Sequence, residues 1–204
     1  MPDSSRYWDR VAHKYAARPI PDQAAYDRKL AATRRYLRSD MDVLELGCGS
    51  GMTAVLHAPF VRSIQGIDGS EKLIAIARQR GLDAKTANTV FTCTSIEAFD
   101  PGERVFNAVL GLNVLHLVDD WRATIRRVHE LLAPGGVFVS VTPCITGRLW
   151  RLALPAVAVT GLIPRVRFIA PDDLTGVLGE AGFHVEEQWH ADKVPTVFLV
   201  VRKQ

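Results

Sequence analysis

Residues 43–51 read VLELGCGSG, an apolar run that ends in three glycines at alternate positions. Residues 52–56, which follow, are compatible with a helix, so the stretch predicts a strand, a tight turn and a helix. Glycine has no Cβ and accepts positive φ, which lets the backbone N–H groups of such a turn approach a ligand closely. By itself, this loop indicates a nucleotide-like ligand.

A second apolar run, residues 63–67, ends at Asp68, which lies 21 positions after Gly47. In a βαβ unit this spacing places a carboxylate at the tip of the second strand, where it can accept hydrogen bonds from two ribose hydroxyls. We therefore expect a ligand with an unphosphorylated ribose. The alternative is that the glycines only form a turn and that Asp68 caps a helix at Ser70.

The chain resembles the class I S-adenosylmethionine-dependent methyltransferase family in three places. These are the glycine loop with Glu45 before it, Asp68, and the sequence LLAPGG at 131–136. The match covers nearly the whole chain in the right order. The resemblance implies an α/β fold in three layers, a doubly wound, Rossmann-like and mostly parallel seven-stranded sheet whose last strand is antiparallel. It also implies S-adenosyl-L-methionine as cofactor and S-adenosyl-L-homocysteine as product.

The resemblance assigns roles to residues of this chain. Glu45 would bind the methionine ammonium, Asp68 the ribose, and Ser95 and Ile96 the adenine, with Leu73 on the adenine-side wall. Many family members carry an aspartate at the place of Ser95; a serine hydroxyl is a weaker, uncharged acceptor, and Glu97 is the alternative. The full set of expected cofactor contacts is Glu45, Gly47, Cys48, Gly49, Ser50, Gly51, Asp68, Gly69, Leu73, Ser95, Ile96, Leu112 and Asn113.

Two other functions compete with methyl transfer. A nicotinamide-dependent oxidoreductase would use the same crevice, but its loop is usually G-x-G-x-x-G/A, and here the third glycine comes one position early, with Met52 in its slot. Glu45 also suits a ligand with an ammonium better than a pyrophosphate. The second alternative is a non-catalytic module that binds S-adenosylmethionine, although the cofactor-binding motifs are intact.

Composition limits the classes of partner. The 204 residues include 25 basic and 22 acidic side chains, a net charge of +3 without a run of five like charges, which gives little support to nucleic acid as a partner. The six histidines form no Cys/His or H-x-x-x-H cluster, so we expect no metal. The cysteines Cys48, Cys93 and Cys144 form no C-x-x-C pair and read as reduced core residues of a cytosolic protein.

Targeting and membrane signals are weak. The first turns carry Asp3, Arg6, Asp9 and Arg10 rather than the apolar core of a signal peptide. The longest uncharged apolar stretch, residues 152–164, has 13 residues and two prolines, too short to span a bilayer. We expect a cytoplasmic protein.

The chain length favours one methyltransferase domain, residues 1–204. We divide it into an N-terminal helical cap (1–38), a cofactor-binding core (39–146), an apolar cap insertion (147–168) and a C-terminal helix with a β-hairpin (169–204). Within the cap, a helix over 4–17 carries Trp8, Val11, Ala12 and Tyr15 on one face. Tyr7 and Trp8 either pack onto the sheet or form a lid over the cofactor.

The other helices and strands are predicted from hydrophobic periodicity and from the glycine and proline residues that end or begin elements. We expect helices over 22–37, 70–79, 119–132 and from Pro171, with Gly81 ending the second of these. Strands are expected at 42–46, 63–67, 90–93, 105–110, 137–141, 184–188 and 196–201. The last two have no helix between them, so as neighbours they must pair antiparallel.

The end of the strand at 105–110 leads to Asn113 and His116, which we place near the sulfur and the transferred methyl, because ligands bind beyond the carboxyl ends of parallel strands. His116 is the candidate catalytic residue, a general base for an acceptor hydroxyl, since imidazole titrates near neutrality. The alternative is that His116 only packs at a helix start or shapes the pocket.

The insertion at 147–168 is rich in Leu, Val, Ala and Ile and is edged by Arg148, Arg151, Arg165 and Arg167. The family resemblance implies that an insertion at this point of the fold stands beside the methyl, so we expect a small-molecule acceptor that is apolar or amphipathic. The arginines could face an anionic head group or make a weak peripheral membrane contact; ordinary packing of an amphipathic helix is the alternative. The acceptor atom and the oligomeric state are left open.

Overall fold

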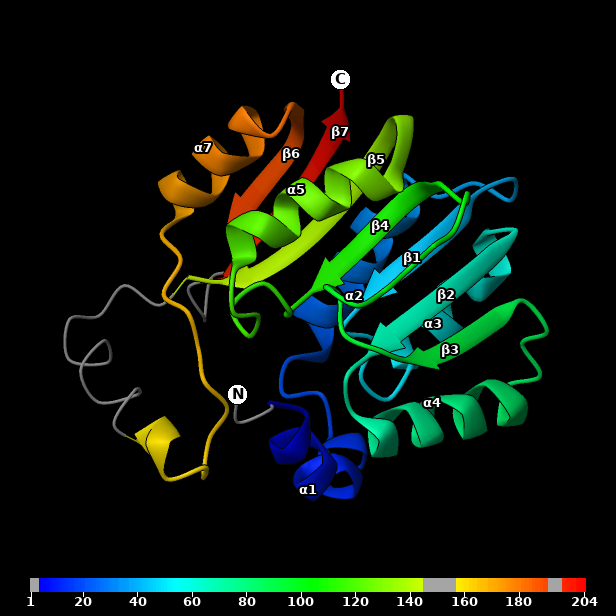
Figure 1. Ribbon diagram of the computed structural model, residues 1–204. Coiled ribbons are helices and arrows are strands. Elements are labelled where there is room, and N and C mark those ends of the chain that lie inside the picture. The colour runs from blue at the N-terminus through cyan, green and yellow to red at the C-terminus, as the bar shows by residue number, and fades with distance from the viewer. Residues whose placement is uncertain (1–3, 145–156, 191–195) are drawn as a thin grey trace.

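The computed structural model describes residues 4–144, 157–190 and 196–204. Seven strands form one sheet in the order β3-β2-β1-β4-β5-β7-β6 (Figure 1). The strands are β1 Asp42–Leu46, β2 Ser63–Asp68, β3 Thr89–Cys93, β4 Phe106–Leu112, β5 Leu132–Pro143, β6 Phe183–His190 and β7 Thr196–Lys203. The helices are α1 Ser4–Ala16, α2 Gln23–Arg34, α3 Met52–His57, the 3-10 turn η1 Ala58–Phe60, α4 Glu71–Asp83, α5 Trp121–Leu131 and α7 Pro171–Glu180.

The sheet is doubly wound from its centre. β1 pairs in parallel with both β2 and β4, β2 pairs in parallel with β3, and β4 with β5. β7 lies between β5 and β6 and is antiparallel to both. The predicted mostly parallel sheet with a reversed last strand is confirmed.

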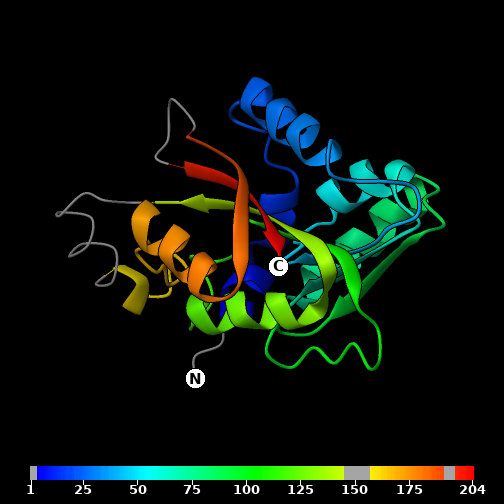
Figure 2. The ribbon, with the colours of Figure 1, turned by 90° about the horizontal axis from the view of Figure 1, so that it is seen from above.

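Helices cover both faces of the sheet, because alternate residues of the buried strands point to opposite sides. Leu44 and Val109 pack in one apolar cluster with Ile125 of α5 and Leu174 of α7. Val43, Ala108 and Leu110 pack in the other, with Ala32 of α2, Ala54 of α3 and Ile74 of α4. Figure 2 shows the resulting three layers, with α2 and α5 on opposite sides of the sheet.

α1 belongs to neither layer. It lies beside α4, at the carboxyl ends of the parallel strands (Figure 1). Because parallel strands in doubly wound sheets present ligand sites at these ends, α1 stands over the place where a ligand is expected.

Several predicted boundaries were wrong. Gly81 does not end a helix: α4 continues to Asp83, and Lys85 takes the left-handed conformation at φ 54° instead. A Cβ on Gly81 would lie 3.0 Å from Thr89 Oγ1, so this glycine permits close packing of α4 on β3. α2 ends at Arg34, three residues before the predicted Leu37.

The structure also differs from the sequence prediction at one cysteine and at the start of β5. Cys93 is exposed, not a core residue, because it ends the edge strand β3, whereas Cys48 and Cys144 are buried. β5 begins at Leu132, with an irregular register before Val137. Residues 147–156 of the predicted insertion lie outside the described residues. Among the helices that are described, none has the length and apolarity needed to cross a membrane.

Candidate cofactor and acceptor site

The glycine loop turns sharply between β1 and α3. Gly47, Gly49 and Gly51 all have positive φ, at 61°, 54° and 73°. A Cβ on Gly47 would lie 2.5 Å from Val114 Cγ2, so a larger residue would clash as well as strain the backbone. The loop is tied to the next strand by a hydrogen bond of 3.0 Å from Cys48 N to Ile67 O.

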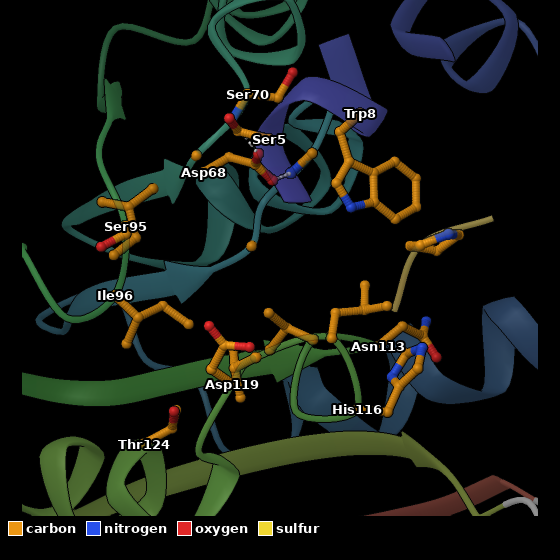
Figure 3. Close-up of a pocket in the computed structure, with 18 of the residues that line it drawn as sticks. Ser5, Trp8, Asp68, Ser70, Ser95, Ile96, Asn113, His116, Asp119 and Thr124 are labelled. Atoms are coloured by element: carbon orange, nitrogen blue, oxygen red, sulfur yellow. Dashed lines mark hydrogen bonds between the residues drawn. The ribbon is translucent and has the colours of Figure 1, made fainter. Parts of the chain in front are cut away.

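A cavity of about 980 Å³ opens at the carboxyl ends of the strands (Figure 3). It brings together most of the predicted contacts, in line with the rule that ligands bind at this edge. The predicted residues that line it are Gly47, Gly49, Asp68, Gly69, Leu73, Ser95, Ile96, Leu112, Asn113 and His116.

Asp68 stands at the tip of β2 and faces this cavity. Its Oδ2 accepts a hydrogen bond from Gly49 N at 2.9 Å and its Oδ1 one from Ser70 N at 2.8 Å. Burial raises the pKa of Asp68, whereas these two backbone N–H groups act in the opposite direction. Each carboxylate oxygen keeps a free lone pair, so the group is oriented and can still accept hydrogen bonds.

A smaller cavity of about 360 Å³ also adjoins the loop, and Glu45 lines it. Glu45 is only 3% exposed, and its Oε2 has no hydrogen-bond partner among the described residues. Burial, and then the charge of Asp68, raise the pKa of Glu45 to about 8. A hydrogen bond from the Ala54 backbone acts in the opposite direction. A buried oxygen without a partner is costly, so the bare Oε2 indicates that a further donor belongs beside it.

The two cavities meet at residues that line both: Tyr15, Gly47, Leu112 and Asn113. Asn113 has φ 61°, a conformation that asparagine adopts more readily than most residues, and its N–H donates to Val141 O at 2.7 Å. The turn after β4 thus brings backbone close to the glycine loop.

His116 lies beyond this turn, near Asn113, on the wall of the larger cavity (Figure 3). Its Nδ1 is buried and has no hydrogen-bond partner among the described residues. Burial lowers the pKa of His116 to about 4. The imidazole is therefore neutral at physiological pH, with a ring nitrogen left to accept a proton or a hydrogen bond.

A family model of methyltransferase domains matches residues 13–188. The chain belongs to the class I S-adenosylmethionine-dependent methyltransferases. Its cofactor is S-adenosylmethionine, and S-adenosylhomocysteine is the product. The alternative of a nicotinamide-dependent oxidoreductase is not favoured.

A curated relative agrees with this assignment, and solved structures show the same fold. The methyltransferase is 31% identical to the ubiquinone biosynthesis O-methyltransferase of Bradyrhizobium sp. (strain ORS 278), over 91% of this chain and 78% of the relative. Its fold is similar to that of the CcbJ methyltransferase from Streptomyces caelestis, with a TM-score of 0.78, 24% identity and coverage of 98% and 99% of the two chains. It is also similar to magnesium protoporphyrin IX methyltransferase from Synechocystis PCC 6803, solved with bound S-adenosylhomocysteine, with a TM-score of 0.73, 17% identity and coverage of 98% and 93%.

The cofactor contacts that were predicted do not all face a cavity in the methyltransferase. Cys48 and Ser50 line the smaller one, but Gly51 lines neither. A Cβ on Gly51 would lie 2.8 Å from Ala77 Cβ, so this residue serves the packing of the loop on α4. Arg80 of α4 fixes Ser50 by donating to its carbonyl oxygen at 2.5 Å and to its hydroxyl at 2.7 Å.

The residues predicted to contact the adenine all line the larger cavity. Leu73 and Ile96 are buried at 2% and 7% exposure and line the larger cavity. Ser95 lines it too, and its Oγ accepts a hydrogen bond from Ala98 N at 3.1 Å. The hydroxyl of Ser95 is therefore already used by its own loop, although an oxygen lone pair is left. Glu97 lines the same cavity.

Several lining residues were missed from the sequence. Arg18 and Lys29 bring two cations to the smaller cavity. Burial lowers the pKa of Lys29. Ser5 and Trp8 of α1 face the larger cavity, and the Tyr15 ring lies over the loop, its Cε1 being 3.6 Å from where a Cβ on Gly49 would stand. Trp8 had been predicted either as a lid over the cofactor or as packing on the sheet, whereas Arg18, Lys29, Ser5 and Tyr15 had been given no role at the site.

The described residues hold no group of three His, Cys, Asp or Glu side chains arranged to bind a metal ion.

Proposed function

We propose that the two cavities together hold S-adenosylmethionine, with the sulfonium at their junction beside Gly47 and Asn113. The observation that supports this placement is the pair of acids, buried Glu45 on the smaller cavity and half-buried Asp68 on the larger one. The unpartnered Oε2 of Glu45 fits an ammonium, and Asp68 keeps lone pairs for two ribose hydroxyls. The residues present therefore fit the cofactor.

The remaining assignments follow from charge and polarity. Lys29 and Arg18 would bind the methionine carboxylate, because they bring positive charge to the cavity that Glu45 lines. Ser95, Ile96 and Leu73 would hold the adenine between a polar edge and an apolar wall. The cations were not foreseen because Lys29 lies on α2 and Arg18 in the connection before it, well before the glycine loop in the sequence.

The acceptor would occupy the rest of the larger cavity, between Trp8 and residues 164–166. Its walls there include the apolar residues Leu117, Val118, Pro143, Pro164 and Val166. This lining suits a small molecule with substantial apolar surface. Because the relatives are named ubiquinone biosynthesis O-methyltransferases, we infer a hydroxyl oxygen, such as that of a phenol or quinol, as the acceptor atom.

The bound cofactor supplies a methyl group that is already electrophilic, so the protein has to align the acceptor and exclude water. Trp8 and residues 164–166 form the walls that shield the reacting atoms. The neutral imidazole of His116, on the wall of the larger cavity, would accept a hydrogen bond from the acceptor hydroxyl and take its proton as the methyl leaves the sulfur for that oxygen. Burial holds the pKa of His116 at about 4, so the imidazole would give up that proton readily once solvent returns to the site.

The first experiment compares ligands. S-adenosylhomocysteine should raise the melting temperature of the purified protein, whereas NAD should not. Replacing Asp68 by Ala should weaken the calorimetric affinity for S-adenosylhomocysteine at least tenfold, at about 1.5 to 3 kcal/mol for hydrogen bonds to a charged group. Unchanged affinity in a folded variant would contradict the placement of the ribose.

The second experiment addresses the acceptor. Methyl transfer should be measured to quinols, phenols, fatty acids and lipid head groups, with RNA and protein as controls. We expect transfer to phenols or quinols. Transfer only to RNA or protein would exclude a small-molecule acceptor. A weak membrane contact, suggested by exposed Val159 and Leu162, is tested by co-sedimentation with liposomes.

The division into a cap (1–38), core (39–146), insertion (147–168) and C-terminal part (169–204), and the cytoplasmic location, stay predictions.

A further inference from the structure

Asp9 attaches α1 to the beginning of α4. Its Oδ1 accepts a hydrogen bond from Ser70 Oγ at 2.6 Å and another from Lys72 N at 3.1 Å. A carboxylate suits this place, because the first backbone N–H groups of a helix lack partners within it and carry a partial positive charge. Ser70 is fully buried and is the N-cap of α4, its Oγ accepting from Leu73 N at 3.2 Å.

Ser70 also contacts Asp68, the residue proposed to bind the ribose. Its backbone N–H donates to Asp68 Oδ1 at 2.8 Å, while Asp68 Oδ2 accepts from Gly49 N at 2.9 Å. One continuous series of hydrogen bonds therefore runs from Asp9 on α1, through Ser70 and Asp68, to the glycine loop. Figure 3 shows Ser70 and Asp68 beside the α1 residues Ser5 and Trp8.

The helix held by Asp9 supplies part of the site. Trp8 and Tyr15 line the larger cavity, and their rings meet edge to face with centroids 5.3 Å apart. Burial, and then the negative charges of Asp68 and Glu45, raise the pKa of Tyr15. Its phenol therefore stays protonated at physiological pH. If α1 left α4, the cavity would lose this wall, and Ser70 would lose its hydrogen-bond acceptor.

We infer that Asp9 is a positioning residue for cofactor binding: it docks α1 on Ser70, and Ser70 in turn fixes Asp68 in the orientation that receives the ribose. The inference rests on the proposed placement of the ribose at Asp68. Docking of α1 and binding of the cofactor stabilise each other, because both need Ser70 and Asp68 in the same positions.

The test measures the affinity for S-adenosylhomocysteine by calorimetry in matched variants. Asp9→Ala removes both hydrogen bonds and should weaken binding about tenfold, the scale of a lost hydrogen bond to a charged group. Asp9→Asn keeps an oxygen that can accept from Ser70 and Lys72, and should bind within about threefold of the wild type. Lys14→Ala, an exposed change on the same helix, should bind like the wild type.

A double-mutant cycle separates positioning from a general role in folding. In the Asp68→Ala background, Asp9→Ala should cost less affinity than it does in the wild type, because the route through Asp68 is gone and only the wall supplied by α1 can still be lost. Full affinity in folded Asp9→Ala would overturn the inference, and so would losses that simply add to those of Asp68→Ala. If Asp68→Ala itself binds normally, the ribose placement fails first and the inference with it; if only Asp9→Ala binds normally, the ribose placement stands.

Discussion

Among single residues, Glu45 combines a function with a cost to stability. Its carboxyl has a pKa of about 8 in the folded protein against an ordinary value of 4.5. Between these values the folded state binds more protons than the unfolded state, so the free energy of unfolding falls as pH rises. Below about pH 4.5 the group is protonated in both states and makes no difference.

Glu45→Gln should therefore stabilise the unliganded protein while weakening the cofactor site. At pH 8 we expect a melting temperature a few degrees above the wild type, and at pH 4.5 no difference. Affinity for S-adenosylhomocysteine should fall at least tenfold, because the ammonium loses its charged partner. Glu180→Gln, an exposed change on α7, serves as the control. A variant less stable than the wild type at pH 8 would disprove this account of Glu45.

His116→Asn tests the proton acceptor. Turnover of a hydroxyl acceptor should fall about a hundredfold, with unchanged affinity for S-adenosylhomocysteine. Since burial lowers the pKa of His116 to about 4, its protonation should not reduce turnover between pH 8 and 6 in the wild type. Equal turnover in the variant would return His116 to a purely structural role.

The sequence predicted those residues whose positions depend on spacing along one βαβ unit. Asp68 and Glu45 are fixed relative to the glycines by two strands and a turn, and the structure places both beside the cavities. Lys29 and Tyr15 reach the site from helices whose docking depends on tertiary packing. An amphipathic pattern shows that a face is covered, without showing by what.

At the level of secondary-structure elements, Arg167 joins the segment before α7 to the turn after β4. Its backbone N–H donates to His116 O at 2.7 Å, and its guanidinium bonds Val118 O at 3.4 Å and pairs with Asp119 at 2.8 Å. These contacts hold residues 164–166, which line the acceptor side of the cavity, against the turn that carries His116.

Arg167→Ala keeps the backbone hydrogen bond to His116 O but removes both guanidinium contacts, and should loosen this segment. We expect a higher KM for the acceptor and a lower kcat, while the affinity for S-adenosylhomocysteine stays the same. The exposed pair with Asp119 contributes little by itself, so the effect should depend on position rather than on charge. Arg126→Ala, on the exposed face of α5, is the matched control. A loss of cofactor affinity in Arg167→Ala would show that the segment supports the whole site instead.

Element boundaries were harder to predict than the elements. Gly81 carries the usual signal of a helix end, yet α4 runs past it, because the absence of a side chain there lets the helix pack on Thr89 of β3. Local sequence cannot distinguish a glycine needed for positive φ from one needed for close packing. The order of the strands followed from the family resemblance and not from local pattern.

For the whole molecule, buried histidines predict sensitivity to acid. His57 has no exposed surface, and neither ring nitrogen has a hydrogen-bond partner among the described residues. Burial, and then the charge of Arg34, lower the pKa of His57 to about 4. In the unfolded chain it titrates near 6.5, so the unfolded state binds more protons between these values and stability is lost as pH falls through this window.

Replacing His57 by Leu should flatten this dependence. The variant should lose less stability than the wild type between pH 6.5 and 4.5, measured as the denaturant midpoint at each pH. His184→Gln, an exposed change on β6, should follow the wild-type curve. Equal slopes in His57→Leu and the wild type would assign the acid sensitivity to other groups.

The protonation of Glu45 also means that binding of the cofactor should change the pH of the surrounding solution. In the empty site Glu45 holds a proton at pH 7, whereas an ammonium beside it requires the carboxylate. Loading should therefore release up to one proton per site, and affinity should rise with pH, approaching tenfold per unit, until about pH 8. Calorimetry in two buffers with different ionisation enthalpies measures that proton directly, and Glu45→Gln should abolish its release. In a weakly buffered solution the enzyme would acidify its medium when it takes up its cofactor and take protons back when the product leaves.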